Sequence, residues 1–517
     1  MMRRLAERPG LVFGLVFTWK MALLVFTAQP VPANDAFFYD GPVVHYLLHG
    51  RYVNPSLALV LPISGSEVYC AYPPLYQLAL LGWMRVFGTS VLAAMWLHAV
   101  LLGCYMLAVL GIFRRLNTPA WCVNLAGLFL FSITFHDRPD TLAHLLGALA
   151  IYGLVRAARG SEATARTAKA WSWLGAALLL LTLCTSLQIG AIYCCWGGLL
   201  VLGGSWLKRM AFPGVPALAV AGAIAGLIAL VRFGFPLLWE GFQEHAKLTP
   251  SFTGWRVPGA GDLLKLARTA PGILLTGALL ASLAARGKIC QARVAKSAHL
   301  LLAITGTMVA FALFGACLVI VTANTVHIAN YLQPVIVGCF LAAQFDRVEG
   351  IKAGKLQAAL FVAAAGLVSV RAIGMTTWGA ACHADMGHRK SEQWVRKQLE
   401  AAPPGSAVVL SSAYLYEAAR HPRVRGIHAD WPGKPARTGN WEGNALVNLK
   451  PARLIITQFD YYRRYESVLA FLRAQPDLVE ISVYNTASTP SPDSIKSLQR
   501  VVQHVAWAPV IVEFSWR

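Results

Sequence analysis

Charged residues are scarce in this sequence. Only 13% of the 517 residues are Asp, Glu, Lys or Arg, whereas a soluble domain usually has roughly 25%. Hydrophobic residues make up 56% of the chain, and the mean hydropathy is +0.53. This composition excludes a soluble globular protein over most of the length. Apolar stretches of about 20 residues, the length of a bilayer-spanning helix, recur from Leu11 to Trp378.

The sequence also lacks a disulfide framework and a closed metal-binding motif. Most of the 10 cysteines lie in apolar stretches, where they behave as small hydrophobic residues. Cys70 and Cys382 are the ones expected outside the membrane, and the sequence leaves open whether they pair. The segment CHADMGH (382–388) has metal-ligating residue types, but its spacing matches no closed zinc site. Nothing in the sequence therefore requires a metal or a cofactor.

Acidic residues are few, and the 45 basic residues against 24 acidic ones give a net charge of +21. Such an excess can indicate nucleic-acid binding, so the positions of the basic residues decide. They gather in alternate connections between the apolar stretches, for example at 114–115, 156–169 and 286–296. Cytoplasmic loops of membrane proteins show this bias, so we expect a membrane partner and no nucleic acid.

The basic connections define a topology for a multi-pass protein of the plasma (inner) membrane. Eleven spans are expected, at residues 10–28, 91–113, 119–135, 141–157, 171–189, 191–207, 213–231, 271–286, 299–321, 331–345 and 356–378. With the N-terminus in the cytoplasm, an odd number of spans places the C-terminal region outside. Four connecting segments also lie outside, at 30–90, 136–140, 232–270 and 322–330.

The composition changes near residue 380. Charges, prolines and polar residues become frequent from 381 to 517, and no apolar run is long enough to span a membrane. A helical pattern at 391–400, short apolar runs (AVVLSS, ARLIIT) and Gly/Pro turns are typical of a small α/β unit. We therefore expect an α-helical membrane domain at 1–380, with a long first outer loop, and an extracytoplasmic soluble α/β domain at 381–517.

Acidic residues mark two of the outer segments. Asp35 and Asp40 follow the first span, and Asp140 lies in the short turn HDRPD with His136 and Arg138. Aspartates near helix N-termini are also favourable simply as caps, so position alone does not decide between capping and function. Ionisable clusters at membrane depth usually face the bundle interior or an aqueous cavity, which favours a site around Asp140.

The remaining outer segments offer weaker candidates. His327 and Tyr331 lie in TANTVHIANYLQP, between the ninth and tenth expected spans. An aromatic belt at the membrane surface explains Tyr331 without any site. The segment 232–270 has mixed charge, which is ordinary for a solvated loop, although a basic member such as Arg256 can attract a phosphate.

Taken together, these outer segments resemble the GT-C superfamily of membrane glycosyltransferases, in its protein O-mannosyltransferase and lipid A aminoarabinose transferase branch. That branch carries an Asp after the first span, a Tyr four residues later, a Gly at fifteen and a Pro at twenty, matched here by Asp35, Tyr39, Gly50 and Pro55. Further matches are the Pro-Pro-Leu segment after Tyr72, a second Asp at 140, and His327 before Tyr331-x-x-Pro334. Two departures, Ala36 after the first Asp and Tyr72 before Pro-Pro, leave donor and acceptor specificity open.

The resemblance implies that a sugar moves from a polyprenyl-phosphate donor to a lipid, glycan or protein acceptor on the extracytoplasmic face, with inversion. Asp35 would be the catalytic base and Asp140 would shape the pocket. Substrate-binding residues would be Tyr39, Asp40, Tyr72, His136, Arg138, Arg256, His327 and Tyr331. Two alternatives stay open: a transporter or flippase for lipid-linked saccharides, which usually shows inverted repeats not evident here, and an inactive protein that retains the fold.

Overall fold

The structure is a computed structural model of the whole chain. Apart from isolated positions, the residues that it describes are 10–27, 36–57, 73–116, 120–132, 138–158, 165–206, 214–236, 388–410, 412–421, 423–428, 452–457, 472–484 and 511–516. This part of the chain is mostly helical, with one β-sheet near the C-terminus.

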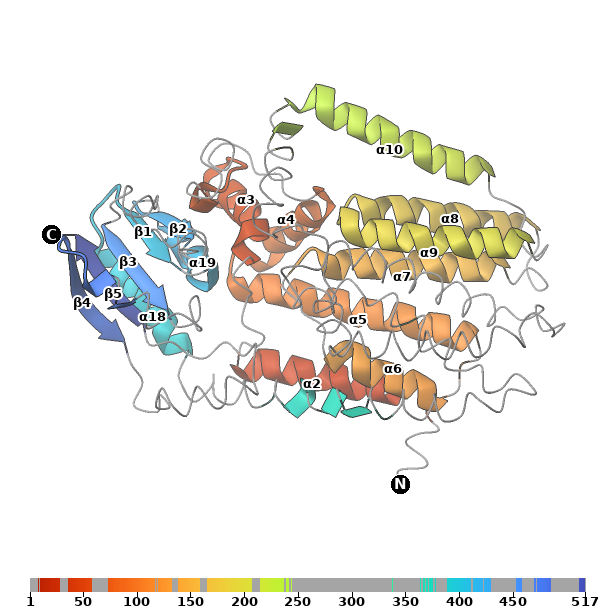
Figure 1. Ribbon diagram of the computed structural model, residues 1–517, viewed down its shortest axis with the longest axis horizontal. Helices are drawn as coiled ribbons and strands as arrows, with labels where there is room; N and C mark the ends of the chain where they lie inside the picture. Colours follow the sequence, from red (N-terminus) through yellow and green to blue (C-terminus); the bar gives the residue numbers. More distant parts are fainter. Residues whose placement is uncertain are drawn as a thin grey trace, which may run out of the picture.

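In the part of the chain that the structure describes, seven helices of the bundle run along the molecule (Figure 1). They are α2 (Leu11–Thr27), α5 (Val91–Arg115), α6 (Ala120–Ser132), α7 (Asp140–Ala158), α8 (Ala165–Leu183), α9 (Leu187–Trp206) and α10 (Gly214–Gly234). Each lies on one of the ranges expected to span the membrane. The four ranges expected after residue 270 fall almost wholly outside the described residues, so the count of eleven stays a prediction.

Within the described residues, α5 is the one helix that meets both the length and the hydropathy of a membrane span. Shorter apolar helical segments occur at Leu11–Val25, Ala120–Leu130, Leu187–Val201 and Ala221–Gly234.

Close backbone packing joins two of the bundle helices. A Cβ on Gly153 of α7 would lie 3.3 Å from the carbonyl oxygen of Trp171 on α8, so a larger residue would push these helices apart.

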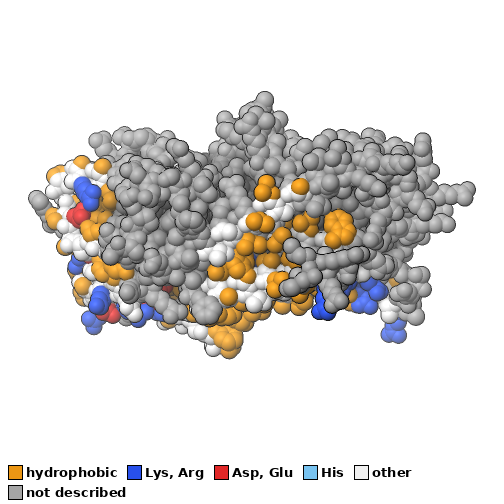
Figure 2. All heavy atoms as spheres, turned by 90° about the horizontal axis from the view of Figure 1, so that it is seen from below, with side chains coloured by type: hydrophobic (Ala, Val, Ile, Leu, Met, Phe, Trp, Pro, Cys, Tyr) orange, Lys and Arg blue, Asp and Glu red, His pale blue; other side chains and the backbone are white. Residues whose placement is uncertain are grey.

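The surface of the bundle is divided along its length. Figure 2 shows exposed hydrophobic side chains across the middle of the molecule and Lys and Arg side chains toward both ends, with Asp and Glu among them at the end of the C-terminal sheet. Arg114 and Arg115 close α5, and Arg156 lies in the last turn of α7. The apolar flank agrees with helices that lie in a membrane, and the orientation stays a prediction.

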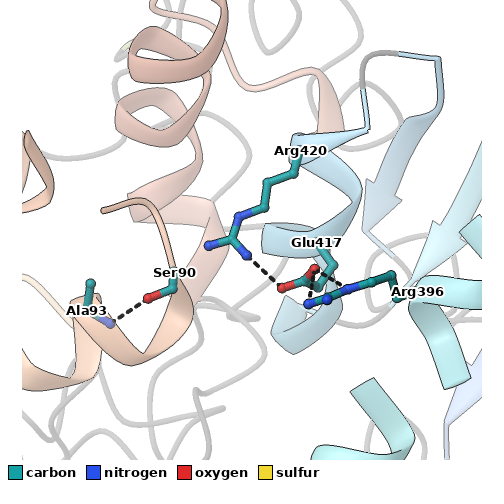
Figure 3. Close-up of polar contacts among 5 residues, drawn as sticks. All are labelled: Ser90, Ala93, Arg396, Glu417 and Arg420. Carbon is teal, nitrogen blue, oxygen red and sulfur yellow. Dashed lines mark hydrogen bonds and ion pairs between the residues drawn. The ribbon is translucent and has the colours of Figure 1, made fainter. Parts of the chain in front are cut away.

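The first outer segment is helical where it is described. It contains α3 (Ala36–His49), the short 3₁₀ helix η1 (Pro55–Leu57) and α4 (Leu75–Phe87), which lie between the bundle and the sheet (Figure 1). The chain then enters α5 through Ser90, whose hydroxyl accepts a hydrogen bond of 3.1 Å from the backbone N–H of Ala93 (Figure 3). Ser90 thus caps α5 at the end of the bundle where α3 and α4 lie.

A side chain from outside α3 replaces the backbone hydrogen bond that a proline removes from this helix. Pro42 has no N–H, so the carbonyl of Phe38 loses the partner that a regular helix would give it. The side-chain amide of Asn54 donates to that carbonyl at 3.5 Å and to the carbonyl of Phe37 at 3.0 Å. Gly41 leaves the room for this contact, because a Cβ there would lie 2.4 Å from the Asn54 amide nitrogen. The chain after α3 therefore folds back and stabilises the helix.

We call α18 (His388–Ala401), α19 (Ser412–Arg420) and a five-stranded sheet together the C-terminal unit. Its strands are β1 (Ala407–Leu410), β2 (Arg425–His428), β3 (Arg453–Thr457), β4 (Leu478–Tyr484) and β5 (Ile511–Trp516). The sheet order is β2-β1-β3-β5-β4, with β1 parallel to β2 and β3, and β5 antiparallel to β3 and β4. The expected helical pattern falls on α18, and the two apolar runs fall on β1 and β3.

The C-terminal unit shares a hydrophobic core with the first outer segment. Buried side chains of α3, α4 and α5 form one cluster with those of α18, β1 and α19, including Phe37, Tyr76, Leu399 and Tyr416. Helix α19 packs on α3, and β2 lies against η1. The C-terminal unit and the segment between α2 and α5 therefore pack together, and the side of the membrane on which they lie stays a prediction.

Candidate active site

The two regions marked by acidic residues meet through Arg138. Its Nε lies 3.2 Å from Oδ2 of Asp140, and its Nη2 donates a hydrogen bond of 3.1 Å to the hydroxyl of Tyr39. The guanidinium carbon is 5.4 Å from the centroid of the Tyr39 ring. The first outer segment and the turn before α7 are therefore joined by a cation held between a carboxylate and a phenol. We call Tyr39, Arg138 and Asp140 the arginine cluster.

The arginine cluster is almost fully buried. The side chains of Arg138 and Asp140 are 6% and 1% exposed, and Tyr39 is 4% exposed. Asp140 is the first residue of α7, where the free N–H groups and the helix dipole favour a negative charge. A buried ion pair of this kind is costly to break, because the residue that remains keeps an uncompensated charge.

Asp40 follows Tyr39 on α3 and has a different environment. Its Oδ1 accepts a hydrogen bond of 2.8 Å from Tyr76 of α4, and its Oδ2 accepts one from Tyr416 of α19. The Tyr76 hydroxyl also lies 2.9 Å from Nε2 of His98 on α5. We call these four residues the Asp40 network.

Burial raises the pKa of the Asp40 carboxyl from 3.8 to about 7, although the two tyrosine hydrogen bonds act in the opposite direction. Desolvation is the larger effect because the carboxyl is 1% exposed. No described cation forms an ion pair with Asp40. The network therefore tolerates a protonated carboxyl near neutral pH.

Four of the ten site residues predicted from the sequence lie in the part of the chain that the structure describes. Tyr39, Arg138 and Asp140 come together in the arginine cluster, and Asp40 lies in the adjacent network. The other six lie outside the described residues: Asp35, Tyr72, His136, Arg256, His327 and Tyr331. Asp35 directly precedes Ala36, the first residue of α3. Cys70 and Cys382 also lie outside the described part.

Sequence reasoning missed Tyr76, His98, Tyr416 and Asn54. Tyr76 belongs to the Tyr72-Pro-Pro-Leu segment that carries the family resemblance, so a signal was present there. Tyr416 had none, because it is 376 residues from Asp40 and lies in an ordinary amphipathic helix. In the part of the chain that the structure describes, no group of three or more His, Cys, Asp or Glu residues is arranged to hold a metal ion.

The comparisons with known proteins rest on structure. No protein-family model matches the sequence, and no curated protein matches it. Among solved structures, ArnT from Cupriavidus metallidurans bound to undecaprenyl phosphate is similar over 97% of both chains, with a TM-score of 0.52 and 14% identity. ArnT is a GT-C glycosyltransferase. The chain has the GT-C fold.

A second GT-C glycosyltransferase also matches. The archaeal oligosaccharyltransferase AglB from Archaeoglobus fulgidus, in complex with an inhibitory peptide and a dolichol-phosphate, matches over 93% of this chain and 74% of its own length, with a TM-score of 0.47 and 14% identity. GT-C proteins are polytopic membrane proteins, which agrees with the apolar helices of this chain. The likeness to ArnT confirms the GT-C-like helical fold that the sequence resemblance predicted, and the count of eleven spans stays a prediction.

Proposed function

We propose that this protein is a membrane glycosyltransferase that moves a sugar from a polyprenyl-phosphate donor to an acceptor on the extracytoplasmic face. The observation that carries the proposal is the arginine cluster. It places a buried cation between the start of α7 and the helix that directly follows Asp35. The GT-C fold, shared with an ArnT that was solved with undecaprenyl phosphate, supports a lipid-phosphate ligand.

Arg138 suits the leaving group of such a reaction. The donor leaves as a phosphomonoester, whose second pKa is about 6, so its departure needs positive charge more than a general acid. A guanidinium binds phosphate through planar, charge-assisted hydrogen bonds. In this proposal Asp140 and Tyr39 hold the guanidinium in place, and Arg256 and His327 add positive charge from the other outer segments.

Asp35 would act on the acceptor. Its carboxylate takes the proton of an acceptor hydroxyl while the hydroxyl oxygen attacks the anomeric carbon. The bond from that carbon to the phosphate oxygen breaks, and the phosphate leaves with the electron pair. Attack from the side opposite to the phosphate inverts the anomeric centre. Tyr72, His136 and Tyr331 would line the substrate pocket.

Membrane lipid and glycan profiling tests this proposal. Mass spectrometry would compare membranes of cells with and without the protein, and a glycan or glycolipid lost on deletion would identify the product. We expect the wild-type protein to restore it and Asp35→Asn, expressed at an equal level, to fail. The matched control is Asp477→Asn, which makes the same chemical change at an exposed turn of the C-terminal unit.

Two outcomes would contradict the proposal. Full restoration by Asp35→Asn removes the assigned base. Accumulation of the lipid-linked sugar on the cytoplasmic leaflet after deletion identifies a flippase instead, because a missing transferase leaves the donor on the outer leaflet.

A further inference from the structure

Helix α3 presents neighbouring residues to two different parts of the molecule. Phe37 and Asp40 are three residues apart, which places them on the same face of a helix. Both contact Tyr416, and the rings of Phe37 and Tyr416 meet edge to face with centroids 4.8 Å apart. Tyr39 precedes Asp40 by one residue, so its side chain points about 100° away from that of Asp40 around the helix axis. It contacts Arg138. A rotation of α3 that breaks one contact therefore moves the other.

The Asp40 network continues from the bundle to the C-terminal unit. It runs from His98 of α5 through Tyr76 of α4 and Asp40 of α3 to Tyr416 of α19. All four side chains are at most 1% exposed. In a water-excluded network the loss of one donor leaves the remaining polar atoms unsatisfied, so the geometry is strongly preferred over a displaced one.

A second contact fixes the far end of α3. Nε2 of His49, the last residue of the helix, lies 2.9 Å from the backbone carbonyl oxygen of Ala419 on α19. Helix α19 thus contacts α3 near its start and at its end. Glu417 ties α19 to α18 through its ion pair with Arg396, and it also forms an ion pair with Arg420 within α19 (Figure 3). These contacts make α19 a rigid support for α3.

We infer that Tyr416 and Asp40 are positioning residues of the transfer site: they fix the rotation of α3 at which Tyr39 contacts Arg138, so the C-terminal unit completes the site for the lipid phosphate. The inference rests on the proposed function and adds a residue from the far end of the chain to it. Tyr416 contacts Phe37 and Asp40 on one face of α3, and it acts on the arginine cluster through that helix.

The test measures binding of undecaprenyl phosphate to the full-length protein in lipid nanodiscs. Tyr416→Phe removes the hydroxyl but keeps the ring against Phe37, and we expect it to weaken binding about 2- to 12-fold, the range for one lost buried hydrogen bond. Asp40→Asn, which keeps the size of the side chain, should weaken binding in the same direction. The control is Tyr484→Phe, the same change on β4, and it should bind like the wild type.

A double-mutant cycle separates positioning from a general structural role. Tyr39→Phe removes the hydroxyl that Arg138 donates to. If Tyr416 acts through the contact between Tyr39 and Arg138, Tyr416→Phe adds little to the loss already caused by Tyr39→Phe. Additive losses overturn the inference, and so does unchanged binding in both Tyr416→Phe and Asp40→Asn.

A measurement without ligand keeps the two proposals separate. Amide hydrogen exchange of the peptide covering 36–49 should be faster in Tyr416→Phe than in Tyr484→Phe. If the wild-type protein does not bind the lipid phosphate, the proposed function is refuted. If exchange is nevertheless faster in Tyr416→Phe, the anchoring of α3 by Tyr416 is supported. Equal exchange in the two variants overturns the inference even if the wild type binds.

Discussion

Asp40 and Asp140 are both 1% exposed, yet their partners differ. Asp140 faces the guanidinium of Arg138, whereas Asp40 accepts hydrogen bonds from two neutral phenols. A buried cation offsets the desolvation of a carboxylate, whereas the hydrogen bonds from the two phenols offset it only in part, so burial raises the pKa of Asp40. The first arrangement can organise charge around a phosphate. The second one serves better as an anchor, which is why we assign Asp40 to positioning rather than to substrate binding.

Removing Arg138 should have the largest effect. Arg138→Gln leaves Asp140 buried without its counter-charge, and we expect a loss of about 3–5 kcal/mol in unfolding free energy, together with loss of lipid-phosphate binding. Thermal unfolding in detergent would measure the first effect. The double variant Arg138→Gln/Asp140→Asn removes both charges and should recover part of the stability without recovering binding.

The matched control for this variant is Arg473→Gln. Arg473 forms a 2.8 Å ion pair with Glu480, but their side chains are 51% and 31% exposed, so the change should cost at most about 1 kcal/mol. Equal destabilisation by Arg138→Gln and Arg473→Gln would show that burial of the arginine cluster contributes nothing special.

Asp40 should make stability depend on pH. The pKa of its carboxyl is about 7 in the folded protein and near 3.8 when exposed, so between these values the folded state holds a proton that the unfolded state has lost. Stability therefore falls as pH rises from about 4 to 7, by on the order of 4 kcal/mol at most. The neighbouring groups are the phenols of Tyr76 and Tyr416 and the imidazole of His98 behind Tyr76.

Asp40→Asn provides the comparison for this pH dependence. Other groups titrate in the same range, so the informative quantity is the difference in melting temperature between wild type and variant at each pH. We expect the variant to gain stability relative to the wild type as pH rises from about 4 to 7. Parallel melting curves would show that Asp40 does not hold a proton in the folded state.

The two aspartates also differ in how far their partners could be predicted from the sequence. The helices of the bundle are predictable because the bilayer imposes a local length of about 20 apolar residues, and the resemblance around Asp35 and Asp140 indicated the fold. Arg138 was found because four ionisable residues crowd into one short turn. Tyr416 was not predictable, since its role depends on how α19 packs against a helix 376 residues earlier. Sequence patterns encode local burial, and they do not encode which distant surface covers it.

The smallest predicted effect concerns the local support of α3 by Asn54. Asn54→Ala leaves the carbonyl of Phe38 without its donor and should cost about 1–3 kcal/mol in unfolding free energy. Gly41→Ala should cost a similar amount, because its Cβ would lie 2.4 Å from the Asn54 amide. Gly82→Ala on α4, where no atom lies within 4 Å of the added Cβ, is the control and should be neutral or slightly stabilising.

The double variant Gly41→Ala/Asn54→Ala sharpens this prediction. Asn54→Ala removes the atoms that the new methyl group would meet, so adding Gly41→Ala should cost almost nothing. The helix propensity of Ala over Gly even favours the second change by roughly 0.5–1 kcal/mol. Chemical or thermal unfolding of the four proteins in detergent gives the coupling energy directly. Strictly additive costs would mean that the Asn54 side chain does not lie against α3, and the anchoring of α3 would then depend on α19 alone.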